Sequence, residues 1–304
     1  MHAPIDPAAK PKLLPTRVLI QFAIVTLIWG STWTVIRGQL GVVPPSWSVA
    51  YRFLLAGGMM ILFCLATRRS LKATASAHGF YLLMALFQFV MNFNLVYRAE
   101  AYVTSGLVAV AFALLIVPNA LFAWAFLGQR VSLRFAWGSL LGIVGVSLLF
   151  WRELDTMGTG VGTGLALTLL AVVSASVSNV MQASARGRSL DIFTTLAWAM
   201  TYGGLFNAAF AWSQSGPPVI EPTFTYVAGV VYLAAAASAL AFAIYYDMIR
   251  AVGPARAAYS SVVVPFVAMA LSTLFEGYRW TPLAFAGGAL TIAGLYIALR
   301  ARAR

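Results

Sequence analysis

Amide and hydroxyl side chains interrupt several long apolar stretches, and they are the groups in this sequence best suited to chemistry. Gln88 and Asn92 lie four residues apart, and Ser174, Ser178 and Gln182 repeat that spacing. On a helix, residues four apart share one face. Polar groups deep in an apolar helix face the protein interior, where they bond to one another or to a solute. The spacing therefore predicts polar faces that are turned inward.

These groups are suited to binding a small zwitterion. Amides and hydroxyls offer partners for both charged ends, and the apolar and aromatic side chains nearby would surround the remainder. The alternative is that the polar side chains only hydrogen-bond across helices and hold them together. The residues that we predict to bind a substrate or line its pathway are Gln88, Asn92, Asn119, Ser178, Asn179, Gln182, Tyr245, Tyr246, Tyr259 and Ser260.

The apolar stretches that carry these residues dominate the composition. Of the 304 residues, 61% are hydrophobic and 9% are charged, whereas soluble domains carry about 25% charged residues. A helix needs about 20 apolar residues to cross a bilayer. We predict an all-α polytopic membrane protein with ten transmembrane helices, at approximately 17–36, 47–67, 79–98, 103–127, 134–151, 163–185, 191–212, 223–246, 256–276 and 281–299.

The charges predict the orientation of these spans. The chain has 20 Lys and Arg residues and 8 acidic ones, which gives a net charge of +12. With alternating spans, 15 of the 20 basic residues share the face of the two termini, and the other five are Arg37, Arg52, Arg98, Arg152 and Arg279. Cytoplasmic loops are enriched in basic residues. We therefore expect a multi-pass protein of the cell (inner) membrane with both termini in the cytoplasm, in contact with lipid and not with nucleic acid.

Cysteine and histidine are too scarce for metal or redox chemistry. The only cysteine, Cys64, lies in an apolar run, while His2 lies in the polar N-terminal segment and His78 in a predicted basic loop. A zinc or haem site is therefore not expected. A phosphate-binding G-x-x-x-x-G-K-[ST] loop is also missing from the sequence, which argues against an ATP-driven pump. We expect no catalytic residue, no metal, no cofactor and no enzyme activity.

The two halves of the chain correspond. Pro118 lies ten residues before Gly128-Gln129, and Pro265 lies ten residues before Phe275-Glu276. This predicts two five-helix repeats of inverted topology, which recur in secondary transporters. The expected divisions are a cytoplasmic segment at 1–16, a first repeat at 17–155, a second repeat at 156–300 and a cytoplasmic tail at 301–304.

The paired prolines are candidate gates or helix breaks. A proline inside a helix removes one backbone hydrogen bond. The carbonyls of Leu114 and Ser261 are therefore expected to lack partners, which a membrane helix tolerates only against protein or a watery cavity. Pro118 and Pro265 are thus predicted to line the pathway.

Several motifs together resemble a known family. They are Trp29-Gly30-Ser31-Thr32-Trp33, Arg52-Phe53, the run from Tyr97-x-x-x-Ala101 through Thr104-Ser105-Gly106 to Pro118, and Pro265 with Glu276. In register with ten spans, they resemble the EamA-type branch of the drug/metabolite transporter superfamily. The resemblance implies export of small metabolites, as in bacterial exporters of aromatic and other amino acids. The chain departs from aromatic amino acid exporters at Leu115-Ile116-Val117, where those carry aromatic residues.

The placement of charge bears on mechanism. The sequence places no Asp, Glu or His near the centre of a predicted span, since Glu100, Asp247 and Glu276 all lie close to an interface. We therefore predict gradient-driven, alternating-access export of neutral or zwitterionic metabolites, amino acids above all, without tight proton coupling. The alternatives are multidrug or cationic compound efflux, a proton-coupled antiporter of the same fold, and a channel. For Arg52 the resemblance favours a structural role over attraction of a carboxylate, and the sequence leaves the oligomeric state open.

Overall fold

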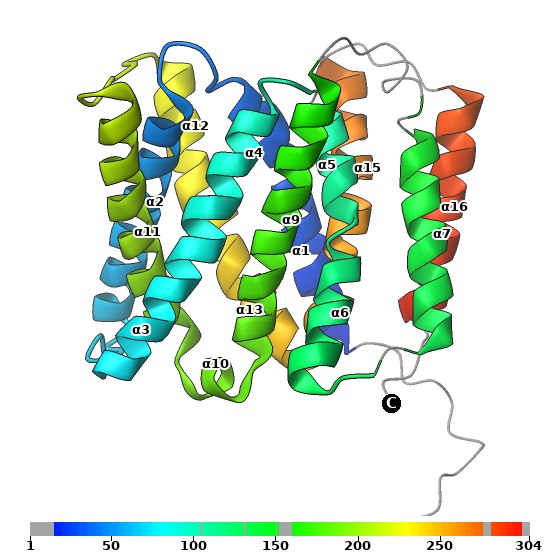
Figure 1. Cartoon of the computed structure of the whole chain (residues 1–304), viewed down its shortest axis with the longest axis horizontal. Coiled ribbons are helices and arrows are strands. Elements are labelled where there is room, and N and C mark those ends of the chain that lie inside the picture. The colour runs from blue at the N-terminus through cyan, green and yellow to red at the C-terminus, as the bar shows by residue number, and fades with distance from the viewer. Residues whose placement is uncertain are drawn as a thin grey trace, which may run out of the picture.

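Helices make up all the regular secondary structure in the residues that the computed structural model describes, which are 15–103, 105–130, 132–149, 151, 160–275 and 281–299 (Figure 1). A helix satisfies its backbone polar groups internally, which a bilayer requires because its core offers no water. The predicted all-α class is therefore confirmed for the described residues. The segments 1–14, 152–159, 276–280 and 300–304, which include Glu276 and the predicted division between the repeats, lie outside them.

The order of the helices follows the apolar runs. The first half contains α1 (Thr16–Arg37), α2 (Pro45–Ala66), α3 (Ala75–Met84), η1 (Ala85–Asn92), α4 (Phe93–Ala99), α5 (Ser105–Ala113), α6 (Ile116–Leu127) and α7 (Leu133–Leu149). The second contains α9 (Val161–Ala183), α10 (Ala185–Ser189), α11 (Ile192–Ser215), α12 (Phe224–Ala234), η2 (Ala235–Leu240), α13 (Ala241–Val252), α14 (Pro254–Ala257), α15 (Tyr259–Phe275) and α16 (Pro282–Leu299). Each of the ten ranges predicted as spans overlaps one of these helical stretches.

Local signals explain where several helices begin and end. Pro45 is the first residue of α2, where a proline lacks only an amide hydrogen that would have no partner. The side chains of Thr74 and Asp191 accept from backbone amides in the first turns of α3 and α11. Gly128 ends α6 in the left-handed conformation, with φ at 65°.

In the part of the chain that the structure describes, six helical stretches are long and apolar enough to cross a membrane. They are Thr16–Arg37, Pro45–Ala66, Ala75–Ala99, Val108–Leu127, Gly162–Ala183 and Phe224–Val252. Shorter apolar helices cover Leu133–Gly145 and Pro282–Ala298. The chain is therefore a polytopic membrane protein.

Helices from the two halves pair with each other. α7 packs along α16, and α2 packs along α11, at opposite sides of the bundle in Figure 1. Glycines permit the first of these contacts, because a Cβ at Gly138 would lie 2.6 Å from the Cβ of Ala298. Between the pairs, α1 contacts α13 and α15, while α9 contacts η1, α4, α5 and α6. The centre of the molecule is thus built from both halves.

The structure changes the expectation for the two prolines. The helix is interrupted at Leu114 and Leu115, ahead of Pro118, and the Leu114 carbonyl accepts from the Val117 amide at 2.9 Å. The prediction of a free Leu114 carbonyl is therefore wrong, because the break lets that carbonyl bond three residues ahead. Pro265 lies inside α15, which continues through it.

His78 lies in helix α3 and not in a loop, which corrects the sequence-based interpretation. Its Nδ1 is 2.8 Å from the Tyr202 hydroxyl, and its ring lies edge-on to Trp198. These contacts join α3 to α11.

Candidate functional site

A cavity of about 80 Å³ lies between the two halves of the chain. Helices α1, α2, η1, α4 and α5 of the first half enclose it with α9, α13 and α15 of the second. Its polar lining residues are Thr32, Arg52, Gln88, Asn92, Asn179 and Ser261. Its aromatic lining residues are Trp29, Trp33, Phe93, Phe112, Phe242 and Tyr245. The cavity therefore combines apolar walls with a few polar groups, as small-molecule sites do.

Five polar atoms of its lining residues are buried without a hydrogen-bond partner in the described residues. They are the donors Trp33 Nε1 and Arg52 Nη1, the acceptors Gln88 Oε1 and Asn92 Oδ1, and the Tyr245 hydroxyl, which can do either. Leaving a buried polar atom unsatisfied costs about 1–3 kcal/mol. Such atoms gathered around one cavity indicate a place where a bound molecule supplies the partners.

Arg52 is the charged group of the cavity. Its side chain is only 1% exposed, and its Nε donates to Ser238 Oγ at 2.8 Å. The guanidinium lies over the ring of Phe93, 4.3 Å from the centroid. Arginine on an aromatic face keeps its charge while its orientation is fixed. Among the described residues, no carboxylate forms an ion pair with it.

A π-helical segment, η1, presents Gln88 and Asn92 to the cavity. Two side chains from the second half hold it: Ser174 Oγ donates to the Phe87 carbonyl at 2.7 Å, and Asn207 Nδ2 donates to the Phe89 carbonyl at 2.9 Å. π-helical turns are rare and occur frequently at functional sites. The face of η1 that borders the cavity is thus positioned by contacts that sequence spacing alone does not reveal.

A second π-helical segment, η2, lies in the second half of the chain and contacts two residues that line the cavity. Its Ser238 accepts from Arg52, and its Ala237 carbonyl accepts from Trp29 Nε1 at 3.1 Å. The Trp29 ring also contacts the ring of Tyr245, with centroids 4.8 Å apart. These contacts orient the Arg52 guanidinium and the Trp29 ring, which both line the cavity.

The Trp29–Trp33 motif has a clear packing role. A Cβ at Gly30 would collide with the side chain of Val267, so a glycine is needed for α15 to approach α1 this closely. Trp29 and Trp33 lie on either side of this contact in sequence, and both line the cavity. The motif therefore brings an aromatic wall and a helix contact together.

Four of the predicted binding residues meet at the cavity. These are Gln88, Asn92, Asn179 and Tyr245. Asn119 lies just behind them, because its Oδ1 accepts from Asn179 at 3.4 Å and its Nδ2 donates to the Pro254 carbonyl. The amides therefore form one connected group.

The remaining predicted residues bond elsewhere. Ser178 pairs with Tyr246 at 3.3 Å, and Gln182 accepts from Arg250. Tyr259 pairs with Ser139 of α7, while Ser260 donates to the carbonyl of Ala257. These contacts tie helices together, and they do not border the cavity.

Sequence reasoning missed some of the lining. Arg52 was assigned to structure, and Trp29, Phe242 and Ser261 were not singled out as binding residues. The Trp29–Trp33 motif was the available signal for Trp29. Phe242 lies three residues before the predicted Tyr245, and Ser261 directly follows the predicted Ser260. The rotation of the helices in the structure shows that Phe242 and Ser261 line the cavity.

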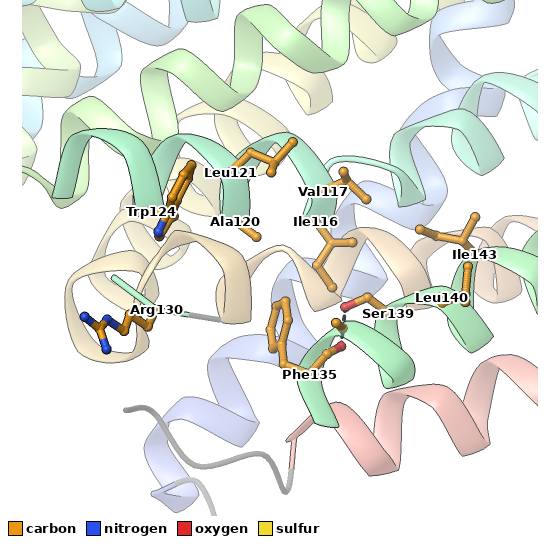
Figure 2. A pocket seen from close by; sticks show the side chains of 11 residues that line it. Ile116, Val117, Ala120, Leu121, Trp124, Arg130, Phe135, Ser139, Leu140 and Ile143 are labelled. Atoms are coloured by element: carbon orange, nitrogen blue, oxygen red, sulfur yellow. Dashed lines mark hydrogen bonds between the residues drawn. The ribbon is translucent and has the colours of Figure 1, made fainter. Parts of the chain in front are cut away.

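A larger crevice of about 770 Å³ lies between α6 and α7, and Figure 2 shows its lining. Leu121, Trp124, Leu140 and Ile143 dominate it, and Trp124 is 61% exposed. Its Ser139 hydroxyl is already bonded to the Phe135 carbonyl (Figure 2). The lining of this crevice is mostly apolar and partly exposed, so we assign the solute site to the central cavity.

Two acidic residues at the ends of spans differ sharply. Asp247 forms an ion pair with Arg17 and accepts from Gln21, so it is a paired charge at the rim of the bundle. Glu100, which follows α4, is 3% exposed, and neither carboxylate oxygen has a partner among the described residues. Burial raises the pKa of Glu100 well above its ordinary range, against the opposing effect of Arg37.

The apolar helices and the polar cavity enclosed at their centre define a polytopic membrane protein with a site for a small solute. The family described as the EamA-like transporter family matches residues 16–151 and 162–300. The chain therefore belongs to the EamA family of membrane transporters, within the drug/metabolite transporter superfamily. This confirms the resemblance inferred from the motifs.

Curated relatives cover nearly the whole chain. Protein PagO of Salmonella typhimurium is 24% identical over 86% of this chain and 86% of its own length. Proteins described as probable amino-acid metabolite efflux pumps are 27% identical in Salmonella typhimurium and 25% identical in Escherichia coli, each over 90% of this chain and 92% of its own length. Further relatives are named as uncharacterized transporters.

A solved crystal structure has the same fold. It superposes with a TM-score of 0.75, at 18% identity, over 94% of this chain and 97% of that chain. The likeness at this identity concerns the fold alone.

Proposed function

We propose that the protein exports small neutral or zwitterionic metabolites, most readily amino acids, from the cytoplasm by alternating access. The observation that carries the proposal is the central cavity, whose lining residues include unpaired donors and acceptors as well as aromatic rings. Such a lining matches a solute that has one positive end, one negative end and an apolar side chain. The relatives described as probable amino-acid metabolite efflux pumps support the same substrate class.

The size of the cavity suits a small molecule. A buried water needs about 10–15 Å³ of such volume, so the cavity of about 80 Å³ corresponds to roughly five to eight water-sized atoms. An amino acid with a short side chain has a similar number of non-hydrogen atoms. Larger amino acids would require the helices around the cavity to move apart, which alternating access provides.

Inverted repeats of five helices are part of this proposal. Three helix contacts join corresponding spans of the two halves, namely α2 with α11, α5 with α15, and α7 with α16. The π-helical segments η1 and η2 also occupy corresponding spans, the third and the eighth. The family match is divided between 151 and 162, close to the proposed boundary at 155. Ten spans, both termini in the cytoplasm and an inner-membrane location complete the topology that we propose.

We further propose that export follows the substrate gradient without tight proton coupling. Among the described acidic residues, none lies at the cavity, and Asp247 is paired at the rim. Protons that move in fixed ratio with substrate in proteoliposomes would overturn this part of the proposal.

The test is a competition screen in proteoliposomes. Amino acids, nucleosides and quaternary amines are compared as competitors of labelled alanine uptake by the purified protein. The proposal expects neutral amino acids to compete best. Competition by quaternary amines alone would instead favour efflux of cationic compounds, and unitary currents in a planar bilayer would favour a channel.

A further inference from the structure

Arg52 combines features that a purely structural arginine does not need. It is buried, it lines the central cavity, and its Nη1 has no hydrogen-bond partner in the described part of the chain. A buried charge is normally paired, because removing a charge from water is costly. The ion pairs of the described residues involve Arg17 with Asp247 and Arg69 with Asp191, not Arg52.

Several neighbours orient the guanidinium of Arg52. They are Ser238, which accepts from Nε, the Phe93 ring, and Tyr97, which is hydrogen-bonded to the Arg52 side chain. The unpaired Nη1 belongs to a residue that borders the cavity. Guanidinium donors match the geometry of a carboxylate, and charge-assisted bonds of this kind are about twice as strong as neutral ones.

Two of the other unpaired atoms of the cavity are acceptors. They are Gln88 Oε1 and Asn92 Oδ1, and both belong to the π-helical segment η1. Amide oxygens suit an ammonium group, which only donates hydrogen bonds. The lining of the cavity therefore includes one cation, from α2, and hydrogen-bond acceptors from η1.

We infer that Arg52 is the carboxylate-binding residue of the cavity, and that Gln88 and Asn92 receive the ammonium group of the same molecule. This inference rests on the proposed function and adds to it a requirement for a free carboxylate. Amines and cationic compounds that lack a carboxylate would leave the Arg52 charge unpaired, so they would be rejected.

The experiment measures binding of three matched ligands to purified protein in detergent, by isothermal titration calorimetry. The ligands are alanine, alanine amide and lactate, which have respectively both groups, only the amine and only the carboxylate. The wild type is expected to bind alanine at least tenfold more tightly than alanine amide, because each lost charged hydrogen bond costs an order of magnitude.

Variants separate binding from folding. Arg52→Gln is expected to lose at least tenfold in alanine affinity with little change for alanine amide, and Arg52→Lys to recover part of that loss. The matched control is Arg98→Gln, which removes an exposed arginine that also lies over an aromatic ring, that of Phe210, but does not line the cavity. It is expected to bind all three ligands as the wild type does.

The outcomes distinguish the two proposals. If the wild type binds alanine and alanine amide equally, or if Arg52→Gln weakens both alike, the inference about Arg52 is overturned while amino acid binding stands. If the wild type binds none of the three ligands, the amino acid function fails and the inference fails with it. If Arg52→Gln does not fold, Arg52→Lys decides: a reduced but remaining preference for alanine over its amide supports a carboxylate bound at Arg52, and a preference equal to that of the wild type or equal binding of the two ligands overturns it.

Discussion

Substitution of the side chains that hold η1 is expected to weaken substrate binding from a distance. Asn207 donates to the Phe89 carbonyl and accepts from Asn94 at 2.6 Å, and Ser174 donates to the Phe87 carbonyl. Neither Asn207 nor Ser174 lines the cavity. Asn207→Ala and Ser174→Ala therefore remove support from η1 and leave Gln88 and Asn92 in place.

The size of the effect follows from the bonds that are lost. Hydrogen bonds between membrane helices are worth about 0.6 kcal/mol on average and about 1.7 kcal/mol at most. Asn207→Ala removes two of them and is expected to lower the free energy of unfolding by about 1.2–3.4 kcal/mol, whereas Ser174→Ala removes one and costs about half as much. A one-residue change of register in η1 would turn a side chain by about 100° around the helix. Losing one amide contact in this way is expected to weaken amino acid binding by about two- to tenfold.

The assay pairs thermal unfolding with binding of labelled alanine to purified protein. Ser139→Ala is the matched control, because it loses one interhelical hydrogen bond, to Tyr259, on the side of the molecule where α7 packs. It should lose stability as Ser174→Ala does and keep its affinity. Unchanged affinity in both Ser174→Ala and Asn207→Ala, or an equal loss in Ser139→Ala, would refute the role assigned to η1.

Three further predictions concern charge and packing. Burial raises the pKa of Glu100 above the unfolded value of about 4.3. Stability should therefore fall as the pH rises from about 4.3 through the pKa of Glu100 in the folded protein. Glu100→Gln should make the melting temperature depend less on pH. Gly138→Leu should lower the melting temperature strongly and disrupt the α7–α16 contact in cross-linking, because even a Cβ would collide with Ala298; an unchanged melting temperature would contradict the packing. Asp247→Asn should retain transport and change stability by at most about 1 kcal/mol, because its partner Arg17 is exposed; abolished uptake in proteoliposomes would give Asp247 a role in coupling.

The sequence predicted the helices well because apolar length decides where a chain crosses a bilayer. The break before Pro118 was predictable too, because proline removes the bond to the carbonyl four residues earlier, and the structure interrupts the helix there, at Leu114. The local rule did not predict that the Leu114 carbonyl would accept from the Val117 amide instead. His78 lies in α3 because the helix begins at Ala75, a few residues before the predicted span at 79–98.

The candidate site was predictable in part. Amide spacing identified Gln88 and Asn92, and both line the cavity. The burial and pairing of Arg52 were not predictable, because Ser238 is 186 residues away along the chain. The π-helical form of η1 depends likewise on Ser174 and Asn207 in the other half. Contacts between distant segments, which periodicity cannot reveal, therefore define the site.

Counterflow in proteoliposomes tests the central claim most directly. Vesicles that contain the purified protein are loaded with unlabelled alanine and diluted into a trace of labelled alanine, with alanine amide as the internal substrate in a parallel sample. The account predicts saturable, transient accumulation of label in vesicles loaded with alanine, and much less in those loaded with alanine amide. Label that only equilibrates without transient accumulation, or equal stimulation by both internal substrates, would contradict a carrier that recognises amino acid zwitterions.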